Sequence, residues 1–127
     1  MRERILPAPP ATPESAPFFE AAAAGKFLVR RCSSCGRTHW YPRAVCPFCF
    51  GATAWEEASG RGTIYSFSVM RRVDPPYAIA YVTLDEGPTM MTNLVDCDVD
   101  ALRIGQRVQL AFRPTDGGAP VPCFRPA

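Results

Sequence analysis

The sequence lacks most of what an enzyme active site is usually built from. Its 127 residues contain one histidine, His39, and one lysine, Lys26. They contain no GxSxG or HExxH motif, no phosphate-binding P-loop and no dinucleotide-binding fingerprint. Cys97 and Cys123 lie on or beside predicted strands, where a free cysteine usually behaves as a small buried hydrophobe. We therefore predict that the chain alone is not an enzyme.

Long apolar segments are also absent. No apolar run approaches the roughly 18 residues that a membrane span requires, and the first residues lack the apolar stretch of a secretory signal. We expect a soluble, cytoplasmic protein with no membrane association. In a reducing cytoplasm the six cysteines should stay thiols or bind metal rather than form disulfides.

Acidic residues are missing from one long interval. No aspartate or glutamate occurs between Glu20 and Glu56. The same interval contains five cations: Lys26, Arg30, Arg31, Arg37 and Arg43. This charge distribution favours an anionic ligand or an acidic partner, and the alternative is a solvated basic face.

What is present divides the chain into four parts. Four prolines predict an extended, flexible arm over residues 1–13. An alanine-rich stretch closed by Gly25 predicts a short helix over residues 14–25, with Thr12 or Ser15 as its cap. A zinc ribbon is predicted over residues 26–58, and a barrel over residues 59–127.

The strongest motif is a pair of CxxC turns separated by ten residues. Cys32 and Cys35 form the first pair, and Cys46 and Cys49 form the second. Four thiolates close a tetrahedral shell, so one structural Zn²⁺ is predicted, with no open position at which to activate water. Iron would fit the same rubredoxin-like shell, but nothing else in the chain suggests electron transfer. Gly36 and Gly51 are expected to permit the tight turns.

Short strands flank and follow these turns. Strands at residues 27–31, 37–43 and 54–57 are expected in the ribbon, with residues 37–43 in the middle. Five further strands are predicted at residues 63–72, 77–84, 89–95, 107–112 and 121–125. The fold class is therefore mainly β, and five strands with a long connection after the third fit an OB-fold barrel. Alternation predicts that Tyr65, Phe67 and Val69 share one face, and that Val108, Leu110 and Phe112 point inward.

The order of these parts resembles a known family. A short helix, the CxxC-x10-CxxC ribbon and a barrel containing the Pro75-Pro76-Tyr77 entry and the Glu86-Gly87 turn are similar to the zinc-ribbon plus OB-fold proteins of acyl-CoA metabolism. That family was long catalogued as a domain of unknown function. The resemblance spans roughly residues 14–125.

The resemblance implies a non-catalytic accessory subunit. Such a chain would dock on a thiolase-superfamily enzyme (thiolase, acyltransferase or steroid side-chain retro-aldolase) or on an acyl-CoA hydratase subunit, and would help to form the acyl-CoA binding surface. Because CoA carries phosphates, the candidate ligand-binding residues are cations: Lys26, Arg30, Arg31, Arg71 and Arg72. The candidate partner-interface residues are aromatic: Phe18, Phe19, Trp40, Tyr41, Phe48 and Phe50.

Two other classes of function stay open at this point. Zinc ribbons and OB barrels also bind single-stranded nucleic acid, and aromatic strand residues could form a stacking platform: Tyr65, Phe67, Tyr77 and Tyr81. The barrel is not basic overall, so no nucleic-acid partner is expected. An independent acyl-CoA enzyme would have to use Cys97 or Cys123 as its nucleophile.

Overall fold

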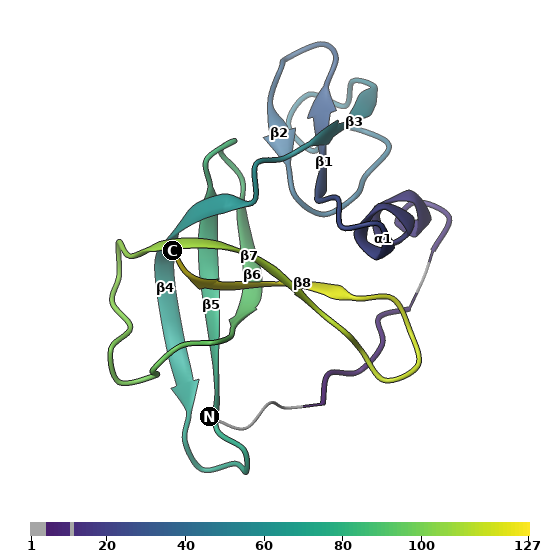
Figure 1. The fold of residues 1–127 in the computed structure, drawn as a ribbon. Helices are drawn as coiled ribbons and strands as arrows, with labels where there is room; N and C mark the ends of the chain where they lie inside the picture. Colours follow the sequence, from purple (N-terminus) through teal and green to yellow (C-terminus); the bar gives the residue numbers. More distant parts are fainter. Residues whose placement is uncertain (1–4, 11) are drawn as a thin grey trace.

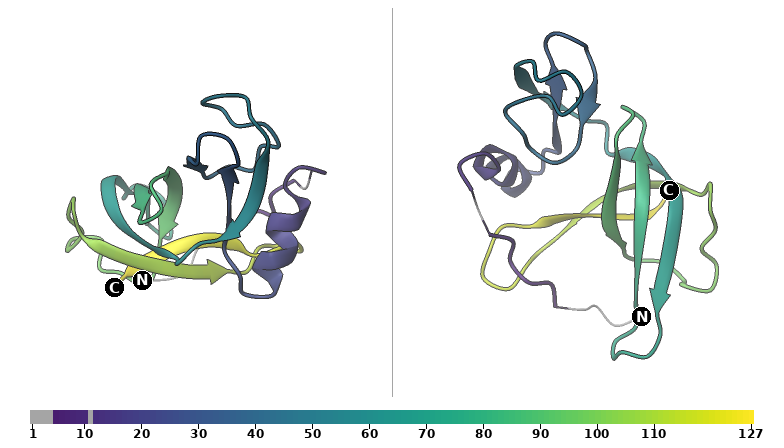
Figure 2. Two further views of the ribbon diagram at one scale, coloured as in Figure 1. Left: turned by 90° about the horizontal axis from the view of Figure 1, so that it is seen from above. Right: turned by 180° about the vertical axis from the view of Figure 1, so that it is seen from behind.

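The computed structural model describes residues 5–10 and 12–127. Figure 1 shows a short helix and a small sheet standing against one end of a barrel, and Figure 2 shows the same arrangement from above and behind. This is the mainly β fold with a zinc ribbon and five-stranded barrel that the sequence predicts. In the described part of the chain, no helix is long and apolar enough to cross a membrane.

The helix α1 (Ala16–Ala23) is shorter than predicted at both ends. Pro17 fits its first turn, where a missing N–H costs nothing. At the other end the N–H of Gly25 donates to the carbonyl of Ala22 at 2.9 Å, which closes the helix. Ser15 does not cap the helix with its side chain; it bonds Thr12 instead, Oγ to Oγ1 at 3.0 Å.

The ribbon sheet consists of β1 (Leu28–Cys32), β2 (Thr38–His39) and β3 (Thr53–Glu57). Its order is β2-β1-β3, and both pairings are antiparallel. The predicted middle strand at residues 37–43 is therefore wrong: β1 is central, and that segment supplies only a two-residue edge strand. The chain leaves the sheet after His39 because Trp40 packs against Phe18 and Phe27.

Five strands form the barrel: β4 (Arg61–Met70), β5 (Tyr77–Leu84), β6 (Thr89–Leu94), β7 (Arg107–Arg113) and β8 (Val121–Pro126). The order β4-β5-β6-β8-β7 closes because β7 pairs with β4. Only β6 and β8 run parallel, and they meet at Leu94 and Phe124. Val108 is buried and Leu110 and Phe112 pack on the core, so the predicted inward face of β7 is confirmed.

The predicted alternation of β4 is wrong at Tyr65. A β-bulge lies between Ile64, which pairs with Val82, and Ser66, which pairs with Tyr81. The extra residue shifts the pattern, so Ile64 and Phe67 face the core while Tyr65 is 67% exposed. Tyr65 and Phe67 therefore do not share a face, and they cannot form one stacking platform.

Part of the Pro-rich arm is packed on the barrel. Leu6 is buried, and its carbonyl accepts a hydrogen bond of 3.0 Å from the N–H of Asp116. Pro7 forms a parallel bridge with the same Asp116. Residues 5–10 of the predicted arm therefore include a segment that is anchored to the barrel. Residues 1–4 and 11 lie outside the described part.

An aromatic cluster joins the helix, the ribbon and the barrel. Phe27 lies at its centre, with ring centroids 5.5 Å from Trp40, 6.3 Å from Phe112 and 6.2 Å from Phe124. Phe18 adds contacts to Phe27 at 6.1 Å and to Trp40 at 5.0 Å. Because these rings come from all three parts, the ribbon is packed on the barrel through apolar contacts.

Candidate functional site

The two cysteine turns have the same backbone hydrogen bonds. In each, the N–H of the first cysteine donates to the carbonyl five residues later, at 2.9 Å from Cys32 and 2.8 Å from Cys46. The carbonyl of that cysteine accepts a bond from the residue after the second cysteine, 3.1 Å from Gly36 and 2.9 Å from Phe50. Backbone N–H groups also point at sulfur: those of Ser34 and Cys35 lie 3.3 and 3.4 Å from Cys32 Sγ.

The four sulfurs are arranged for one metal ion. Their Sγ atoms all lie within 4.8 Å of one another. Cys32 and Cys49 are separated by 3.4 Å and Cys35 and Cys46 by 3.7 Å. A tetrahedral Zn²⁺ with Zn–S bonds of about 2.3 Å needs sulfurs about 3.8 Å apart, so the donor set fits.

One of the four thiols is already acidified by its backbone. The N–H of Cys35 is the main cause that lowers the pKa of Cys32 to about 6, burial opposes it, and the N–H of Ser34 adds to it. A thiolate at neutral pH is the form that binds metal. Cys32 and Cys46 are buried, whereas Cys35 and Cys49 are exposed, so the site lies at the surface. With four protein ligands it stabilises the ribbon and offers no position to a substrate.

The residue after the second cysteine has a left-handed backbone in both turns. Gly36 has φ of 75° and Phe50 has φ of 63°. In the second turn this conformation therefore falls on Phe50 and not on Gly51, where the sequence placed it. Gly51 is required for a different reason: a Cβ there would lie 2.8 Å from Ser34 Oγ and 3.2 Å from Cys32 Sγ.

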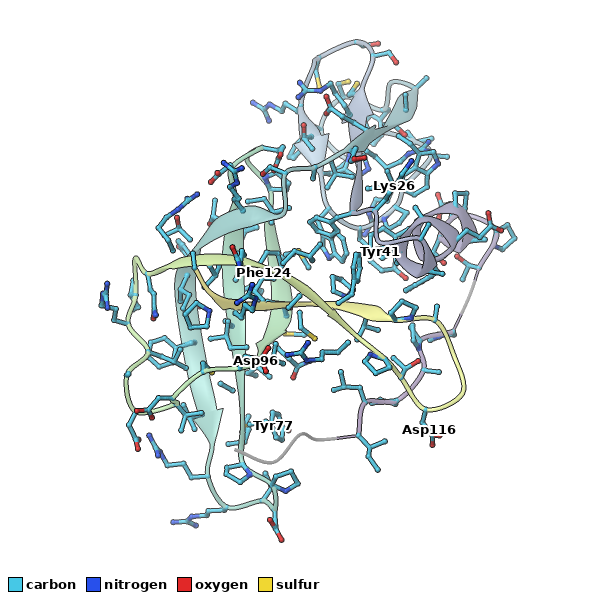
Figure 3. The ribbon with its side chains drawn as sticks, viewed as in Figure 1. Lys26, Tyr41, Tyr77, Asp96, Asp116 and Phe124 are labelled. Carbon is cyan, nitrogen blue, oxygen red and sulfur yellow. The ribbon has the colours of Figure 1, made fainter. Side chains whose placement is uncertain are left out.

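The predicted ligand-binding cations do not form one cluster. Lys26 lies beside the ribbon in Figure 3, whereas Tyr77, which follows the β4–β5 turn, lies near the opposite end of the barrel. Arg71 and Arg72 belong to that distant turn. The five cations therefore belong to two separate places, and which of them bind CoA stays a prediction.

Three of these cations are engaged within the chain. Arg30 donates to Thr53 Oγ1 at 3.0 Å and lies 4.5 Å from the centroid of Trp55. Arg31 pairs with Glu56 at 2.8 Å. Arg71 likewise pairs with a carboxylate, that of Asp100.

The two remaining cations differ from these. Within residues 5–10 and 12–127, the side chains of Lys26 and Arg72 make no ion pair. Both residues are exposed. They are the predicted cations best able to meet an external anion.

The predicted partner-interface aromatics also separate into two groups. Phe18 is only 2% exposed, so it cannot contact a partner as predicted; it packs in the aromatic cluster instead. Phe19 and Trp40 are partly buried against the same core. The other three are exposed: Tyr41, Phe48 and Phe50.

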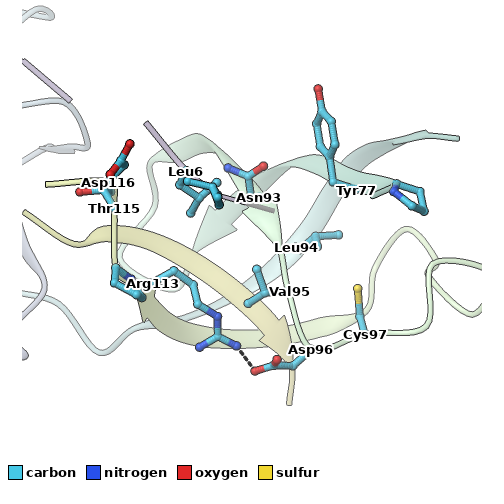
Figure 4. Close-up of a pocket in the computed structure, with 13 residues that line it drawn as sticks. Leu6, Tyr77, Asn93, Leu94, Val95, Asp96, Cys97, Arg113, Thr115 and Asp116 are labelled. Atoms are coloured by element: carbon cyan, nitrogen blue, oxygen red, sulfur yellow. Dashed lines mark hydrogen bonds and ion pairs between the residues drawn. The ribbon is translucent and has the colours of Figure 1, made fainter. Parts of the chain in front are cut away.

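Sequence reasoning missed a cavity of about 630 Å³ at the side of the barrel (Figure 4). Its walls come from the ends of β5 and β6, the start of the β7–β8 connection and the arm residues Ile5 and Leu6. OB folds commonly bind ligands at these strands and loops. Its charged groups are the Arg113–Asp96 ion pair and Asp116, so acidic groups outnumber basic ones.

The candidate nucleophiles Cys97 and Cys123 lie in a different part of the molecule from His39. Cys97 lines the cavity, and burial, with the charges of Asp96 and Asp98, raises the pKa of its thiol. Cys123 is buried in β8. His39 is buried in the ribbon, on β2 and away from both thiols, and desolvation lowers its pKa. These positions do not assemble a nucleophile with a base.

The chain matches two family models in succession. Residues 19–56 match the ChsH2 rubredoxin-like zinc ribbon domain, and residues 55–113 match the ChsH2 C-terminal OB-fold domain. The boundary between them falls in β3, just before the barrel begins.

Curated proteins with related sequences carry two kinds of name. A DUF35 domain-containing scaffold protein of Methanothermobacter thermautotrophicus is 36% identical over 91 residues, which cover 65% of this chain and 68% of that protein. A probable enoyl-CoA hydratase alpha subunit of Thermomonospora curvata is 35% identical over 130 residues, and the match covers 97% of this chain. The chain spans 40% of that subunit's length.

Solved structures agree with these sequence matches. A chain of the Ltp2-ChsH2(DUF35) aldolase aligns with a TM-score of 0.81 and 33% identity, covering 93% of this chain and 98% of that one. A DUF35-family protein from Sulfolobus solfataricus aligns with a TM-score of 0.64 at 17% identity, which supports the fold alone. The chain belongs to the DUF35 family, in which a ChsH2-type rubredoxin-like zinc ribbon precedes an OB-fold domain.

Proposed function

We propose that this chain is a non-catalytic accessory subunit of an enzyme complex that acts on acyl-CoA thioesters. The observation that carries the proposal is the match to a chain of the Ltp2-ChsH2(DUF35) aldolase over 93% of this chain. Cys97 and Cys123 belong to the barrel whereas His39 belongs to the ribbon, and the metal site is closed by four thiols. The partner subunit would therefore supply the reacting groups.

The partner we propose is a thiolase-superfamily enzyme, with retro-aldol cleavage of an acyl-CoA, such as a steroid side chain, as the favoured reaction. The aldolase named above supports this choice. The relative named as an enoyl-CoA hydratase subunit supports a second arrangement, in which the partner is a hydratase. Both arrangements make the ligand a CoA thioester.

On this proposal the chain contributes to the CoA-binding surface through cations that make no ion pair within the described part of the chain. Lys26 and Arg72 meet that condition; Lys26 lies between α1 and β1, and Arg72 lies in the β4–β5 turn at the far end of the barrel from the ribbon (Figure 1). We propose Lys26, because it lies in the segment without acidic residues.

Binding of single-stranded nucleic acid has little support. The cavity at the usual OB-fold ligand position holds two carboxylates against one guanidinium, and a phosphate backbone would be repelled there. Leu6 of the arm also occupies part of that position. Tyr65 and Tyr81 are exposed, yet Phe67 packs on the core, so the expected stacking platform is incomplete.

Affinity capture from the source organism tests the proposed function. The tagged full chain should retain a thiolase-like or hydratase subunit, identified by mass spectrometry, and acyl-CoA turnover should require both proteins. Lys26→Gln should raise the KM for the CoA thioester and leave complex assembly intact, whereas Arg72→Gln should change neither the KM nor the assembly. Full activity and correct assembly of the enzyme without this chain would refute the accessory role.

A further inference from the structure

Phe50 has a backbone conformation that its side chain disfavours. At φ of 63° it is one of the two non-glycine residues with positive φ in the described part of the chain. A left-handed backbone brings the Cβ of an L-residue against its own carbonyl, which is why glycine is usual there. The equivalent residue of the first turn is glycine, Gly36, with φ of 75°. The second turn therefore carries strain that the first one avoids.

Burial of the Phe50 side chain does not offset that strain. It is 81% exposed, matched among the large apolar side chains of the described residues only by Ile5. Strain kept at an exposed aromatic residue indicates a use outside the folded chain itself.

The sequence segment around Phe50 is apolar and basic, and one carboxylate from elsewhere touches it: Glu14 Oε2 accepts a hydrogen bond of 2.9 Å from the N–H of Ala44. Four of the ten exposed large apolar side chains lie within ten residues of sequence here: Tyr41, Val45, Phe48 and Phe50. The guanidinium of Arg37 lies 4.9 Å from the ring centroid of Phe48, which holds a cation against the aromatic surface. No acidic residue occurs from residue 21 to residue 55.

This combination has the composition of a protein-binding hot spot. Aromatic residues and arginine are enriched in such positions, where one or two side chains enter a desolvated pocket. The turn that presents Phe50 is held by the backbone bond to the carbonyl of Cys46 and by the preceding metal ligands Cys46 and Cys49, so the aromatic ring is presented on a rigid support. A surrounding basic charge complements a partner surface that carries carboxylates.

We propose that Phe50 is an anchor that enters an apolar socket bordered by Asp or Glu residues on the partner enzyme subunit, with Phe48 at its edge. The inference rests on the proposed function and adds where the partner is held. It also assigns a second role to the metal: the metal fixes the turn that carries the anchor.

The test replaces Phe50 by glycine in the full-length chain and measures the affinity for the purified partner by calorimetry. Phe50→Gly removes the ring and relieves the strained φ, so the free chain should melt at an equal or higher temperature while the affinity falls at least tenfold. Phe50→Asn, which tolerates the left-handed region, should lose affinity to a similar degree. Phe50→Trp should retain it. Ile104→Ala, which removes an exposed apolar side chain from the barrel, is the matched control and should bind normally.

The basic surroundings are tested separately. Arg43→Gln should weaken binding at low salt and lose that effect as salt rises, because screening removes the charge contribution. If Phe50→Gly binds as tightly as the parent chain, the anchor is wrong although the accessory function stands. If the parent chain itself binds no acyl-CoA enzyme, the proposed function fails first, and the anchor fails with it.

Discussion

The ribbon and the barrel are stabilised in different ways. The barrel closes its sheet on itself and buries a continuous core that includes Ile64, Val82, Leu84, Met90 and Val108. The ribbon sheet has three strands, one of them only two residues long. Too little apolar surface is buried there to offset chain entropy, so metal ligation supplies the missing stabilisation. We therefore expect the folding of the ribbon, but not that of the barrel, to depend on the metal.

Of the changes considered, removal of the metal should have the largest effect on the stability of the ribbon relative to that of the barrel. Structural zinc contributes about 10–16 kcal/mol of apparent binding free energy in small zinc-finger peptides at pH 7, far more than any side-chain contact here. A strong chelator should therefore unfold residues 28–57 and leave the barrel strands folded. Amide hydrogen exchange followed by NMR would locate the loss.

Cys46→Ser provides the matched variant, and Cys123→Ser, which alters a thiol buried in the barrel, provides the contrast. Cys46→Ser should abolish stoichiometric zinc and Cys123→Ser should not. Simultaneous loss of protection in both regions on chelation would show that they fold as one unit.

The second prediction concerns the aromatic cluster that joins the two regions. Phe27→Ala should destabilise the chain by about 3–5 kcal/mol, because the ring is buried among Trp40, Phe112 and Phe124. Urea unfolding followed by tryptophan fluorescence measures the change, since Trp40 reports on the cluster. Leu84→Ala is the control, because Leu84 is buried in the same core but is not one of the rings in contact with Trp40: it should destabilise the chain with a smaller change in the native Trp40 fluorescence. An unchanged stability of Phe27→Ala would mean that ribbon and barrel are not coupled.

A smaller effect should distinguish the two cysteine turns. Gly36→Ala forces a side chain into φ of 75° and should cost about 1–2 kcal/mol, although nothing lies within 4 Å of the added Cβ. Gly36→Asn should cost less, because asparagine tolerates that region. Thermal unfolding of the zinc-loaded chain compares them. Equal stability of parent and alanine variant would remove the strain argument from both turns.

The smallest predicted effect is a pH dependence confined to the ribbon. Burial lowers the pKa of His39 below its usual 6.5, so the unfolded chain binds a proton more readily than the folded one. Stability from this residue is complete above about pH 6.5 and decreases as the pH falls toward the folded-state pKa. His39→Leu should flatten the stability profile between pH 7 and 6, measured with zinc content monitored in parallel. A profile as steep as that of the parent chain would assign the dependence to another group.

The success of sequence reasoning depended on how local the signal was. The CxxC pairs, the five barrel strands and the inward face of β7 follow from spacing and period-2 alternation, and they appear as predicted. Tyr65 was placed on the wrong face because a bulge has no pattern of its own: alternation continues on both sides of it, shifted by one residue. The prediction of a middle strand at residues 37–43 was wrong because Trp40 leaves the sheet and packs against Phe18 and Phe27, which are distant in sequence.

The candidate site shows the same division. Phe18 looked like a surface anchor on a short helix, but its burial depends on contacts with two other parts of the molecule. Arg71 and Arg72 were candidates on the barrel, and only the barrel topology places them in the β4–β5 turn, away from the ribbon cations. The cavity was invisible because its walls come from four separate segments.

The sequence by itself determined the metal ligands, the family resemblance and the order of ribbon and barrel, because each depends on residue types and their spacing along the chain and not on contacts in space. The tertiary structure alone decided which aromatics are buried, which cations are left for a ligand and that Phe50 holds the strained, exposed position. Those properties depend on what lies against each side chain in space, and no local pattern encodes it.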